Sequence, residues 1–586
     1  MTRNPLRLLL LGGLLAIALF VAACGSDDNK SSSSSDSGTK TTVEGKKGGV
    51  LRQLGASDVD FIDPGRTYYT GGYQLAYATN RPLYNFKPGE VDPVPDLAES
   101  NPEISADAKT ITVKLRTGVK FGPPVDREIT SKDVKYAFER FFSKQVQGQY
   151  PSYFTVIEGV PSKLTDGPQD ISGITTPDDQ TIVFKLKSAQ GVSVASSLVM
   201  PITMPVPQEY AKPFDAKSPS TYNTHAVASG PYMVKNDAKG SLTGYKAGKS
   251  IDLVRNPNWD AKTDFKPAYL DGIKWTTNDS DASLAAQRVL KGSHMTLDTN
   301  PPAAELQQAV TNYKDQYQQV PGGGWRYFPL NTTLKPLDNV NVRKAIIAAF
   351  DRDAARKARG GKFTGDIPTH YLPPGIPGFE EAGGLEGTGL DFMSNPRGDM
   401  AVAAEYMKKA GYPSGKYTGK DELLLVAANA DPGKAQAEVA RAQIEKLGFK
   451  IKFRVVPQDV VYNEYCQVPA KKVAICGSAG WFKDFTDPQS MLQPTFKGSE
   501  IVTNGGLNNN LSQLKDPKID AAMDKASLLT GDERLKAWAD IDTMITEAAP
   551  AVPFLWDKST LIWSKDVNGI ASEYDDSPAF AWISFK

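Results

Sequence analysis

Residues 422–456 read ELLLVAANADPGKAQAEVARAQIEKLGFKIKFRVV and have the pattern of a strand, a helix and a second strand. The apolar run from Glu422 to Ala428 suits a buried strand. The helical stripe after it ends at Gly448 and consists of Ala437, Ala440, Ile444 and Leu447. Apolar residues then alternate at Ile451, Phe453 and Val455, as in a second strand. We predict a βαβ unit, and hence an α/β fold with a parallel sheet.

A further parallel strand is predicted at residues 472–476, after a helical stretch at about 459–466. Open parallel sheets bind ligands in the crevice beyond the carboxyl ends of their strands. Residues 477–488 (GSAGWFKDFTDP) follow this strand, so we expect Trp481 and Asp484 at the binding edge. There, Trp481 can stack on a ligand and Asp484 can accept hydrogen bonds from a cation. The alternative is that Trp481 belongs to the core and Asp484 is a solvated loop charge.

The first half of the chain contains shorter elements. Half-buried strands are predicted where Ile111, Val113 and Leu115 alternate, and again at Ile182, Phe184 and Leu186. Between them, Thr130 and Asp133 form a capping-box-like start to a helix. Late in the chain, a helix beginning near Thr530 is predicted to end at Pro550. Residues 551–586 are too few to fold alone and are expected to pack on an earlier part of the chain.

The amino terminus has the pattern of a bacterial export signal. Arg3 and Arg7 precede the apolar run from Leu8 to Ala22, whose ~15 residues are fewer than the ~20 of a membrane-spanning helix. The residues before Cys24 then resemble a lipobox, Val21-Ala22-Ala23-Cys24. An ordinary signal peptide that ends near a cysteine is the alternative.

We therefore expect residues 1–23 to be a lipoprotein signal peptide. Lipid on Cys24 would hold the mature protein at the outer face of the cytoplasmic membrane. Residues 24–47 include five consecutive serines at 31–35 and have almost nothing to bury, so we expect a flexible linker.

Composition excludes several classes of function. The 586 residues include 67 Lys and Arg against 67 Asp and Glu, and removal of Arg3 and Arg7 with the signal leaves a near-neutral chain. Nucleic acid is not an expected partner, because phosphate binding relies on clustered positive charge. His225, His294 and His370 are isolated from cysteines and paired carboxylates, so neither a metal site nor a cofactor is expected. No second apolar run is long enough to cross a membrane.

Cys466 and Cys476 are the only other cysteines. In an oxidising exterior the pair can form a disulfide that closes a short loop. Two buried free thiols are the competing interpretation, and the geometry that decides between them is not visible in a sequence.

A series of short motifs resembles the solute-binding proteins of the oligopeptide and dipeptide type that serve ABC importers, known as family 5. Each motif is weak alone, but together they are specific and follow the family's order from about Gly49 to the carboxyl terminus. The matching stretches are 95–99 (PDLAE), 113–121 (VKLRTGVKF), 130–134 (TSKDV), 229–232 (SGPY), 255–259 (RNPNW), 330–332 (LNT), 342–345 (VRKA), and Gly480-Trp481 with Asp484.

The resemblance implies a two-lobed periplasmic-binding-protein-like fold of type II, in the large peptide-binding subclass, with a hinge between the lobes. Lobe I would span residues 48–300 with an extra subdomain at about 88–225. Lobe II would span 301–550, and 551–586 would return to lobe I. The implied function is to capture a peptide-like solute and deliver it to a membrane permease that works with a cytoplasmic ATPase. A monomer is expected.

The resemblance also implies a role for Asp484. In peptide-binding members the aspartate at this position holds the α-ammonium of the ligand. Closure of the lobes would strip water from both charges, and a buried ammonium needs a hydrogen-bonded counter-charge. Lys483 departs from the small residue expected beside it and can pair with Asp484 itself.

Four more residues are candidates for the binding site. Tyr68 and Tyr69 follow the first strand and can supply flat contacts, with surface or packing roles as the alternative. Asn331 follows the strand-like run 325–330 and is expected to face the cleft. Arg326 can meet a ligand carboxylate.

Other functions are weaker fits to the sequence. Gly244 to Ser250 looks like a phosphate-binding loop, but it is one residue short of the GxxxxGK[ST] spacing. No nucleophile elbow or HExxH motif occurs, which argues against an extracellular hydrolase. A receptor for a macromolecule is disfavoured because a deep crevice suits small solutes. Within the solute-binding class, sugars, opines and metal chelates remain alternatives to peptides.

Overall fold

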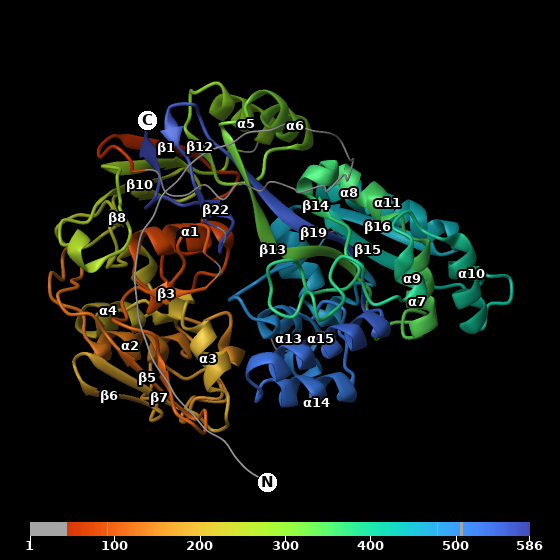
Figure 1. Ribbon diagram of the computed structural model, residues 1–586, viewed down its shortest axis with the longest axis horizontal. Coiled ribbons are helices and arrows are strands. Elements are labelled where there is room, and N and C mark those ends of the chain that lie inside the picture. The colour runs from red at the N-terminus through yellow and green to blue at the C-terminus, as the bar shows by residue number, and fades with distance from the viewer. Residues whose placement is uncertain (1–43, 91, 280, 478, 504–507, 573) are drawn as a thin grey trace, which may run out of the picture. The chain divides into compact units, whose positions relative to one another are not determined.

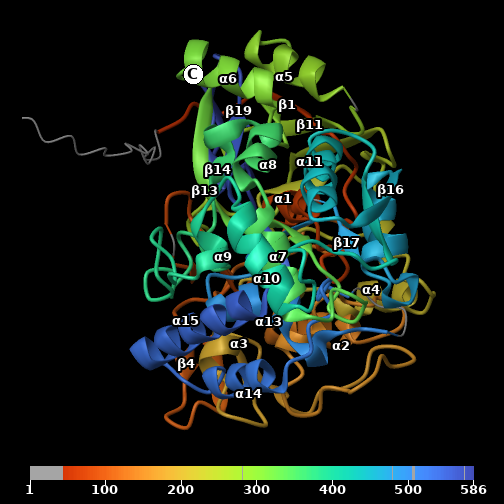
Figure 2. The same ribbon diagram turned by 90° about the vertical axis from the view of Figure 1, so that its right-hand side faces the viewer.

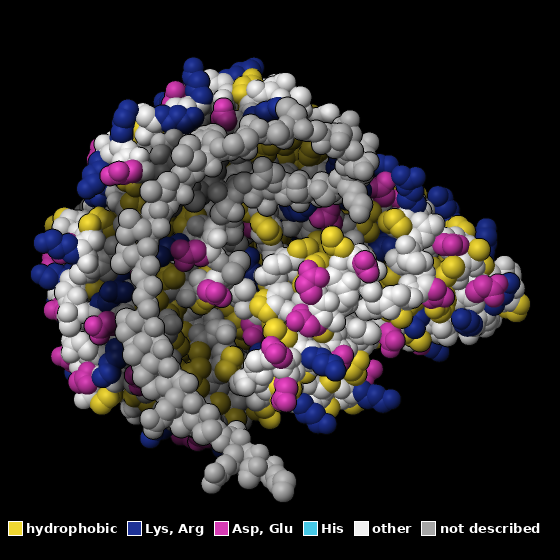
Figure 3. Space-filling view, viewed as in Figure 1, with side chains coloured by type: hydrophobic (Ala, Val, Ile, Leu, Met, Phe, Trp, Pro, Cys, Tyr) yellow, Lys and Arg dark blue, Asp and Glu magenta, His cyan; other side chains and the backbone are white. Residues whose placement is uncertain are grey.

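The computed structural model describes residues 44–586 except 91, 280, 478, 504–507 and 573 (Figure 1). The signal peptide, Cys24 and most of the linker lie outside the described residues. In the part of the chain that is described, no helix is both long and apolar enough to cross a membrane. Basic and acidic side chains are interspersed over the face seen in Figure 3, as the near-neutral composition predicts.

The predicted βαβ unit is confirmed. Strands β15 (Glu422–Ala428) and β16 (Lys450–Val456) pair in parallel, with Glu422 opposite Lys450, and α11 (Gly433–Lys446) connects them. The third strand, β17 (Ile475–Cys476), is parallel to β15 but shorter than predicted. The helical stretch before it is present as α12 (Gln458–Val460) and a π-helix at Val461–Cys466. This three-stranded sheet places residues 477–488 beyond a strand end, as the sequence predicts.

A second sheet carries the candidate site. It has four strands in the order β14 (Gly365–Asp366), β19 (Ala551–Ile562), β13 (Tyr317–Pro329) and β18 (Ala479–Phe482), and every pairing is antiparallel. Strands β13 and β19 are long, and they pair from Pro329 with Ala551 to Tyr317 with Ile562. Their register shifts between Pro321 and Gly324. Beyond β19, Trp563 bridges to Thr296 of the next sheet, so the β13–β19 ribbon connects two sheets.

The amino-terminal sheet has the strand order β12 (Thr296–Leu297), β1 (Val50–Leu54), β11 (Gly272–Thr276), β10 (Ser250–Arg255) and β8 (Tyr232–Val234), with β9 (Tyr245–Lys246) also paired to β10. Carboxyl-terminal side chains share the core of this sheet: Val567, Ile570 and Ile583 pack in one cluster with Leu51 and Trp275. The last residues of the chain thus pack against the first strand.

A smaller antiparallel sheet is inserted after the first strand. Its order is β4 (Glu103–Ile104), β5 (Thr110–Lys114), β7 (Thr181–Lys185) and β6 (Ile174–Asp178). Helix α2 (Ser131–Phe141) covers it and begins with the predicted capping box of Thr130 and Asp133. Phe138 of α2 packs on Phe184 of β7, with ring centroids 5.4 Å apart.

Helices fill the remaining layers. Near the carboxyl terminus, α13 (Pro488–Phe496), α14 (Pro517–Ala526) and α15 (Gly531–Ala548) lie together (Figure 2). Trp538 and Ile545 of α15 are buried, and the chain turns at Ala549 in a left-handed conformation before β19 begins. The other α-helices are α1 (Thr70–Thr79), α3 (Gly191–Ser197), α4 (Gln208–Asp215), α5 (Ala282–Leu290), α6 (Ala303–Asn312), α7 (Val340–Ala349), α8 (Arg352–Arg359), α9 (Asp391–Ser394) and α10 (Met400–Lys409); the short strands are β2 (Tyr84–Asn85), β3 (Val94–Pro95), β20 (Val567–Asn568), β21 (Ala571–Ser572), β22 (Ser577–Pro578) and β23 (Ser584–Phe585).

Candidate functional site

A cleft of about 1740 Å³ gathers residues from distant parts of the chain. Its lining comes from the loop after β1, the start of α1, the starts of α5 and α6, strand β13, the end of α8 and the segment after β18. Residues 574–577 of the carboxyl-terminal segment complete it. A space of this size exceeds the ~300–1,000 Å³ typical of small-molecule pockets.

Asp484 is the most enclosed acidic group of the cleft. It follows β18, whose pairing with β13 sets Trp481 opposite Trp325 and so fixes where the next residues begin. Its side chain is 6% exposed. Tyr153 donates a hydrogen bond to Oδ2 over 2.5 Å, and Tyr68 donates to the same oxygen over 3.2 Å.

The loop at Asp484 is held by a third tyrosine. Tyr574 donates from its hydroxyl to the backbone carbonyl of Asp484 over 2.7 Å. The ring of Tyr153 also packs edge-on against Phe485, with centroids 5.0 Å apart. Three segments remote in sequence therefore converge on one aspartate and hold it in place.

Burial dominates the electrostatics of Asp484. Loss of water raises its pKa to about 7, against smaller lowering effects from the hydroxyls of Tyr153 and Tyr68. A buried carboxyl in this state gains most from a cation, because an adjacent positive charge favours the ionised form. The arrangement is therefore suited to bind an ammonium group.

Trp481, Tyr68 and Tyr69 all line the cleft. Trp481 is also a core residue: it is 8% exposed and its indole nitrogen donates to the carbonyl of Ser490 over 2.9 Å. Both interpretations of Trp481 from the sequence therefore describe part of its environment. Tyr69 is the most open of the three, with half of its surface exposed.

Arg326 reaches the cleft but is already paired. Its Nε donates to Oδ2 of Asp557 over 2.6 Å, and its guanidinium lies 4.8 Å from the centre of the Phe482 ring. Arg359 donates to the same carboxylate over 2.8 Å. Two guanidiniums thus share one carboxylate, which leaves one positive charge for a ligand carboxylate.

Lys483 affects the pKa of carboxyl groups other than that of Asp484. Its charge lowers the pKa of Asp575 and Asp576, whereas burial raises both, and the pKa of Asp576 reaches about 8. The pKa of Asp484 is set by burial and by the hydroxyls of Tyr153 and Tyr68. The expected pairing of Lys483 with Asp484 is therefore not what the structure shows.

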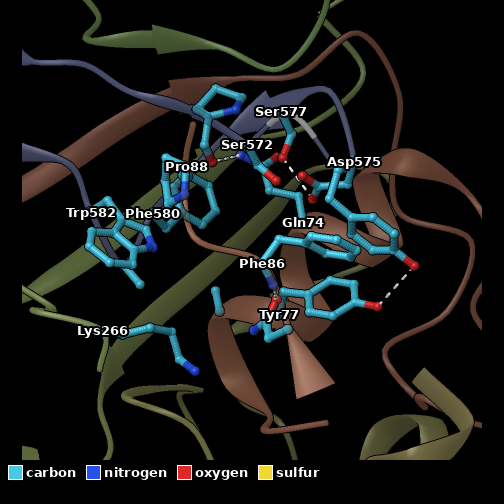
Figure 4. A pocket seen from close by; sticks show the side chains of 16 residues that line it. Gln74, Tyr77, Phe86, Pro88, Lys266, Ser572, Asp575, Ser577, Phe580 and Trp582 are labelled. Atoms are coloured by element: carbon cyan, nitrogen blue, oxygen red, sulfur yellow. Dashed lines mark hydrogen bonds between the residues drawn. The ribbon is translucent and has the colours of Figure 1, made fainter. Parts of the chain in front are cut away.

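A second, much smaller cavity of about 50 Å³ lies next to the cleft (Figure 4). Tyr77, Phe86, Lys266 and Trp582 line it, and Asp575 borders both spaces. A water molecule needs ~10–15 Å³ by a comparable measure, so this cavity has room for a few waters at most. The large cleft is the space that can hold a solute.

The family model described as "Bacterial extracellular solute-binding proteins, family 5 Middle" matches residues 92–502, which is more than half of the chain. The chain belongs to this family. A family 5 protein is the extracytoplasmic solute-binding component of an ABC importer and is not an enzyme.

Curated relatives of this family 5 protein are similar over most of their length. The heme-binding protein A of Haemophilus influenzae is 28% identical over 499 residues, which cover 83% of this chain and 82% of the relative. A dipeptide-binding protein of Pseudomonas aeruginosa is 27% identical over 87% of this chain and 90% of its own. The oligopeptide-binding protein OppA of Bacillus subtilis is 25% identical, with 80% of each chain covered.

Solved structures agree on the mixed α/β periplasmic-binding-protein fold. The clavulanic acid biosynthesis oligopeptide binding protein 2 superposes with a TM-score of 0.81 at 25% identity, covering 94% of this chain and 98% of the other. The oligopeptide-binding protein AppA of Bacillus subtilis, solved with a nonapeptide, gives a TM-score of 0.74 at 18% identity, covering 93% and 100%. The predicted fold class is confirmed by these similarities.

The expectation for Asn331 needs correction. Its side chain is 2% exposed, and its amide donates to the carbonyl of Val473 over 3.0 Å while Thr333 donates to its Oδ1 over 2.6 Å. It is not among the residues that line the cleft. The bridge between Leu330 and Ile475 carries the chain past β17, so Asn331 ties two backbone segments together instead of meeting a solute.

The structure joins Cys466 and Cys476 in a disulfide, with Cα atoms 6.0 Å apart. The bond links the end of the π-helix to β17. Two cleft residues flank it, since Tyr462 lies within that helix and Trp481 follows β17 closely. The disulfide therefore fixes the backbone on both sides of the binding edge.

Several residues of the site were not found from the sequence. No distinctive motif marks the segment of Tyr153, which donates to Asp484, or the segments of the cleft residues Tyr574, Arg359, Asp298 and Glu305. Tyr153 belongs to the inserted subdomain and Tyr574 to the carboxyl-terminal segment, and only the folded chain brings them to Asp484. Their one local signal, an aromatic residue near a Pro or Ser, is too common to be specific.

Proposed function

We propose that this protein captures a peptide or peptide-like solute with a free amino terminus and delivers it to the permease of an ABC importer. The observation that carries the proposal is Asp484, a nearly buried carboxyl in a large cleft whose described partners are tyrosine hydroxyls. A ligand ammonium would supply the missing opposite charge. The names of several relatives, which bind dipeptides or oligopeptides, support this choice of solute.

The remaining cleft residues fit an extended peptide. Trp481, Tyr68 and Tyr69 offer flat surfaces along the cleft, and Arg326 with Arg359 carries the spare positive charge that a carboxylate terminus needs. Backbone hydrogen bonds would give affinity, while a roomy cleft would keep side-chain selectivity low.

The proposal includes the organisation expected from the sequence. Lobe I comprises residues 48–300 with a subdomain at about 88–225, lobe II comprises 301–550, and 551–586 returns to lobe I. Solute contacts to both lobes would stabilise a closed state that docks on the permease, while the cytoplasmic ATPase powers transport. Lipid on Cys24 and the linker 24–47 would keep this monomer near the permease.

Calorimetry with matched peptides tests the role of Asp484. A free-amino pentapeptide should bind the wild-type protein and lose at least tenfold in affinity in Asp484→Ala, whereas the N-acetylated peptide should bind both proteins weakly and alike. Equal losses for both peptides would remove Asp484 from its assigned role. Mass spectrometry of the solute that copurifies is the independent check, and a non-peptide solute would contradict the proposal.

A further inference from the structure

Acidic side chains greatly outnumber basic ones along the cleft. Among the described residues that line it, nine are acidic and three are basic. The acidic residues are Asp58, Asp60, Asp281, Asp298, Glu305, Asp431, Asp484, Asp575 and Asp576, and the basic residues are Arg326, Arg359 and Lys483. A cleft lined by one sign of charge concentrates solutes of the opposite sign.

Each of the three basic residues is already engaged with carboxyl groups. Arg326 and Arg359 share Asp557, which lies just behind the lining. The charge of Lys483 acts on Asp575 and Asp576. The three cations are thus engaged with Asp557, Asp575 and Asp576, and the other acidic residues of the lining lie outside these pairings.

Asp298 is the acidic residue that most closely repeats the situation of Asp484. It follows β12 and accepts the backbone N–H of Ala56 over 3.2 Å, and the side chains of Trp275 and Thr299 also lower its pKa. Burial raises its pKa to about 7, and no lysine or arginine of the described residues lowers that pKa. Trp275 lies close to Asp298. A methyl group added to Gly55 would lie 2.4 Å from the indole nitrogen of Trp275 and 2.5 Å from Oδ2 of Asp298.

Glu305 is a second acidic group of the lining, on the helix that follows β12. It lies in the first turn of α6, seven residues after Asp298, and its side chain is only 9% exposed although it borders the cleft. The hydrogen bond that it accepts from a described residue comes from Ser283 over 3.2 Å. No salt bridge joins Glu305 or Asp298 to a lysine or arginine within the described part of the chain. A buried charge without a counter-charge is unfavourable until a ligand supplies one.

Two further acidic residues of the lining, Asp58 and Asp60, lie on the loop after β1. Asp60 accepts the backbone N–H of Tyr68 over 2.7 Å, and the hydroxyl of the same tyrosine reaches Asp484. Asp58 is held by the N–H of Gly248 over 2.6 Å. These two carboxylates are used to shape the loop after β1, but their charge still faces the cleft. Asp484, Asp298 and Glu305 line the same cleft, so one extended solute can contact all three.

We propose that the solute carries a second positive charge, and that Asp298 and Glu305 bind it. The inference rests on the proposed function, because it assumes a peptide whose amino terminus is at Asp484. The second cation would be the ammonium or guanidinium of a lysine or arginine side chain, so the preferred solutes are basic oligopeptides. A resident metal ion is a poorer fit, since no group of three or more His, Cys, Asp or Glu side chains suited to a metal occurs among the described residues.

A lysine scan measures the preference directly. Pentapeptides of alanine with a free amino terminus would carry lysine at position 2, 3, 4 or 5 in turn, and the matched set would carry norleucine, which has a similar chain without the charge. Calorimetry at pH 7.5 should show at least one position at which lysine binds tenfold more tightly than norleucine. That preference should fall to less than threefold in Asp298→Asn and in Glu305→Gln.

Asp431→Asn is the matched control. It removes the same charge from the cleft lining, but Asp431 is solvent-exposed. It should keep the lysine preference, and thermal unfolding should show that all three variants are folded. If every peptide binds and lysine gains nothing over norleucine, this inference is overturned while the proposed function stands. If Asp431→Asn abolishes the lysine preference as fully as Asp298→Asn does, the preference arises from the negative charge of the whole cleft. The assignment to Asp298 and Glu305 is then wrong.

A binding measurement with spermidine tests whether the preferred solute is a basic peptide or a free polyamine, because spermidine carries positive charges without a peptide backbone. Spermidine binding tighter than every peptide would overturn the peptide part of both proposals. Failure of all peptides and of spermidine would refute the proposed function together with the inference.

Discussion

Peptide affinity should rise steeply with pH below neutrality if Asp484 binds the solute's ammonium as a carboxylate. Its pKa is about 7 in the ligand-free protein, because burial opposes ionisation. An alanine-only peptide isolates this group, since it has no basic side chain to engage Asp298. The ionised fraction of a group with that pKa is ~3% at pH 5.5 and ~50% at pH 7.

The size of the effect follows from these fractions. A peptide α-amino group has a pKa of about 7.7–8.0, so it stays largely protonated over the same interval. If only the carboxylate binds it, affinity should increase roughly 15-fold from pH 5.5 to pH 7, or about 1.6 kcal/mol. Binding at pH 7 should also release about half a proton, because the ligand's charge lowers the pKa of Asp484.

Titration calorimetry in buffers of different ionisation enthalpy measures both quantities. The N-acetylated peptide is the ligand control, and Asp484→Asn, which cannot ionise, is the protein control. For both controls, affinity should stay constant from pH 5.5 to pH 7, and binding should release no proton from residue 484. An affinity that is constant from pH 5.5 to pH 7, with no buffer dependence of the heat, would refute the reasoning for the wild-type protein.

Four further outcomes follow from side-chain contacts in the structure. The folded pKa of Asp484 lies above the ordinary ~3.9, so its contribution to stability is present below about pH 4 and is lost as pH rises through 7. Asp484→Asn should therefore stabilise the ligand-free protein by up to ~4 kcal/mol at pH 8 but not at pH 4. Thermal unfolding at the two pH values would test this. Tyr153→Phe removes the 2.5 Å hydrogen bond to Asp484 and should shift the midpoint of the affinity profile to higher pH, and an unmoved midpoint would assign the tyrosine a packing role only. Arg140→Met leaves the buried carboxylates of Asp63 and Asp215 without their shared guanidinium and should cost ~3–5 kcal/mol in urea unfolding, whereas a loss under 1 kcal/mol would contradict the burial argument. Replacing Cys466 and Cys476 together by serine should cost ~2–3 kcal/mol, and reductant should then leave the stability of the variant unchanged.

The sequence predicts the local parts of this fold well. The βαβ unit at 422–456 and the capped helix after Thr130 depend on periodicity and end signals within one stretch of chain, and both are present. The long pairing of β13 with β19 was not predicted, because its partners are more than 200 residues apart and Gly322 to Gly324 interrupt the alternation of β13. Pairing between such distant segments is decided by the whole core and not by either segment.

The residues of the candidate site likewise divide into those that the local sequence predicts and those that depend on distant segments. Asp484 and Trp481 were predicted because they follow a strand at a known binding edge, and the structure places both at the cleft. Asn331 was expected there for a similar reason, but its amide is used to join two backbone segments. Asp298 and Tyr153 could not be predicted, since their importance depends on burial and on neighbours from other segments.

The three glycines of β13 limit how this scaffold can be modified. A methyl group on Gly322 would lie 2.7 Å from the carbonyl oxygen of Asp557, and one on Gly323 would lie 2.5 Å from Nζ of Lys483. Gly323 also has a φ of +56°, which disfavours any larger residue. Anyone who redesigns the protein as a biosensor should therefore diversify the acidic loops and leave this glycine run intact, because even alanine would displace the ribbon on which both arginine partners of Asp557 depend.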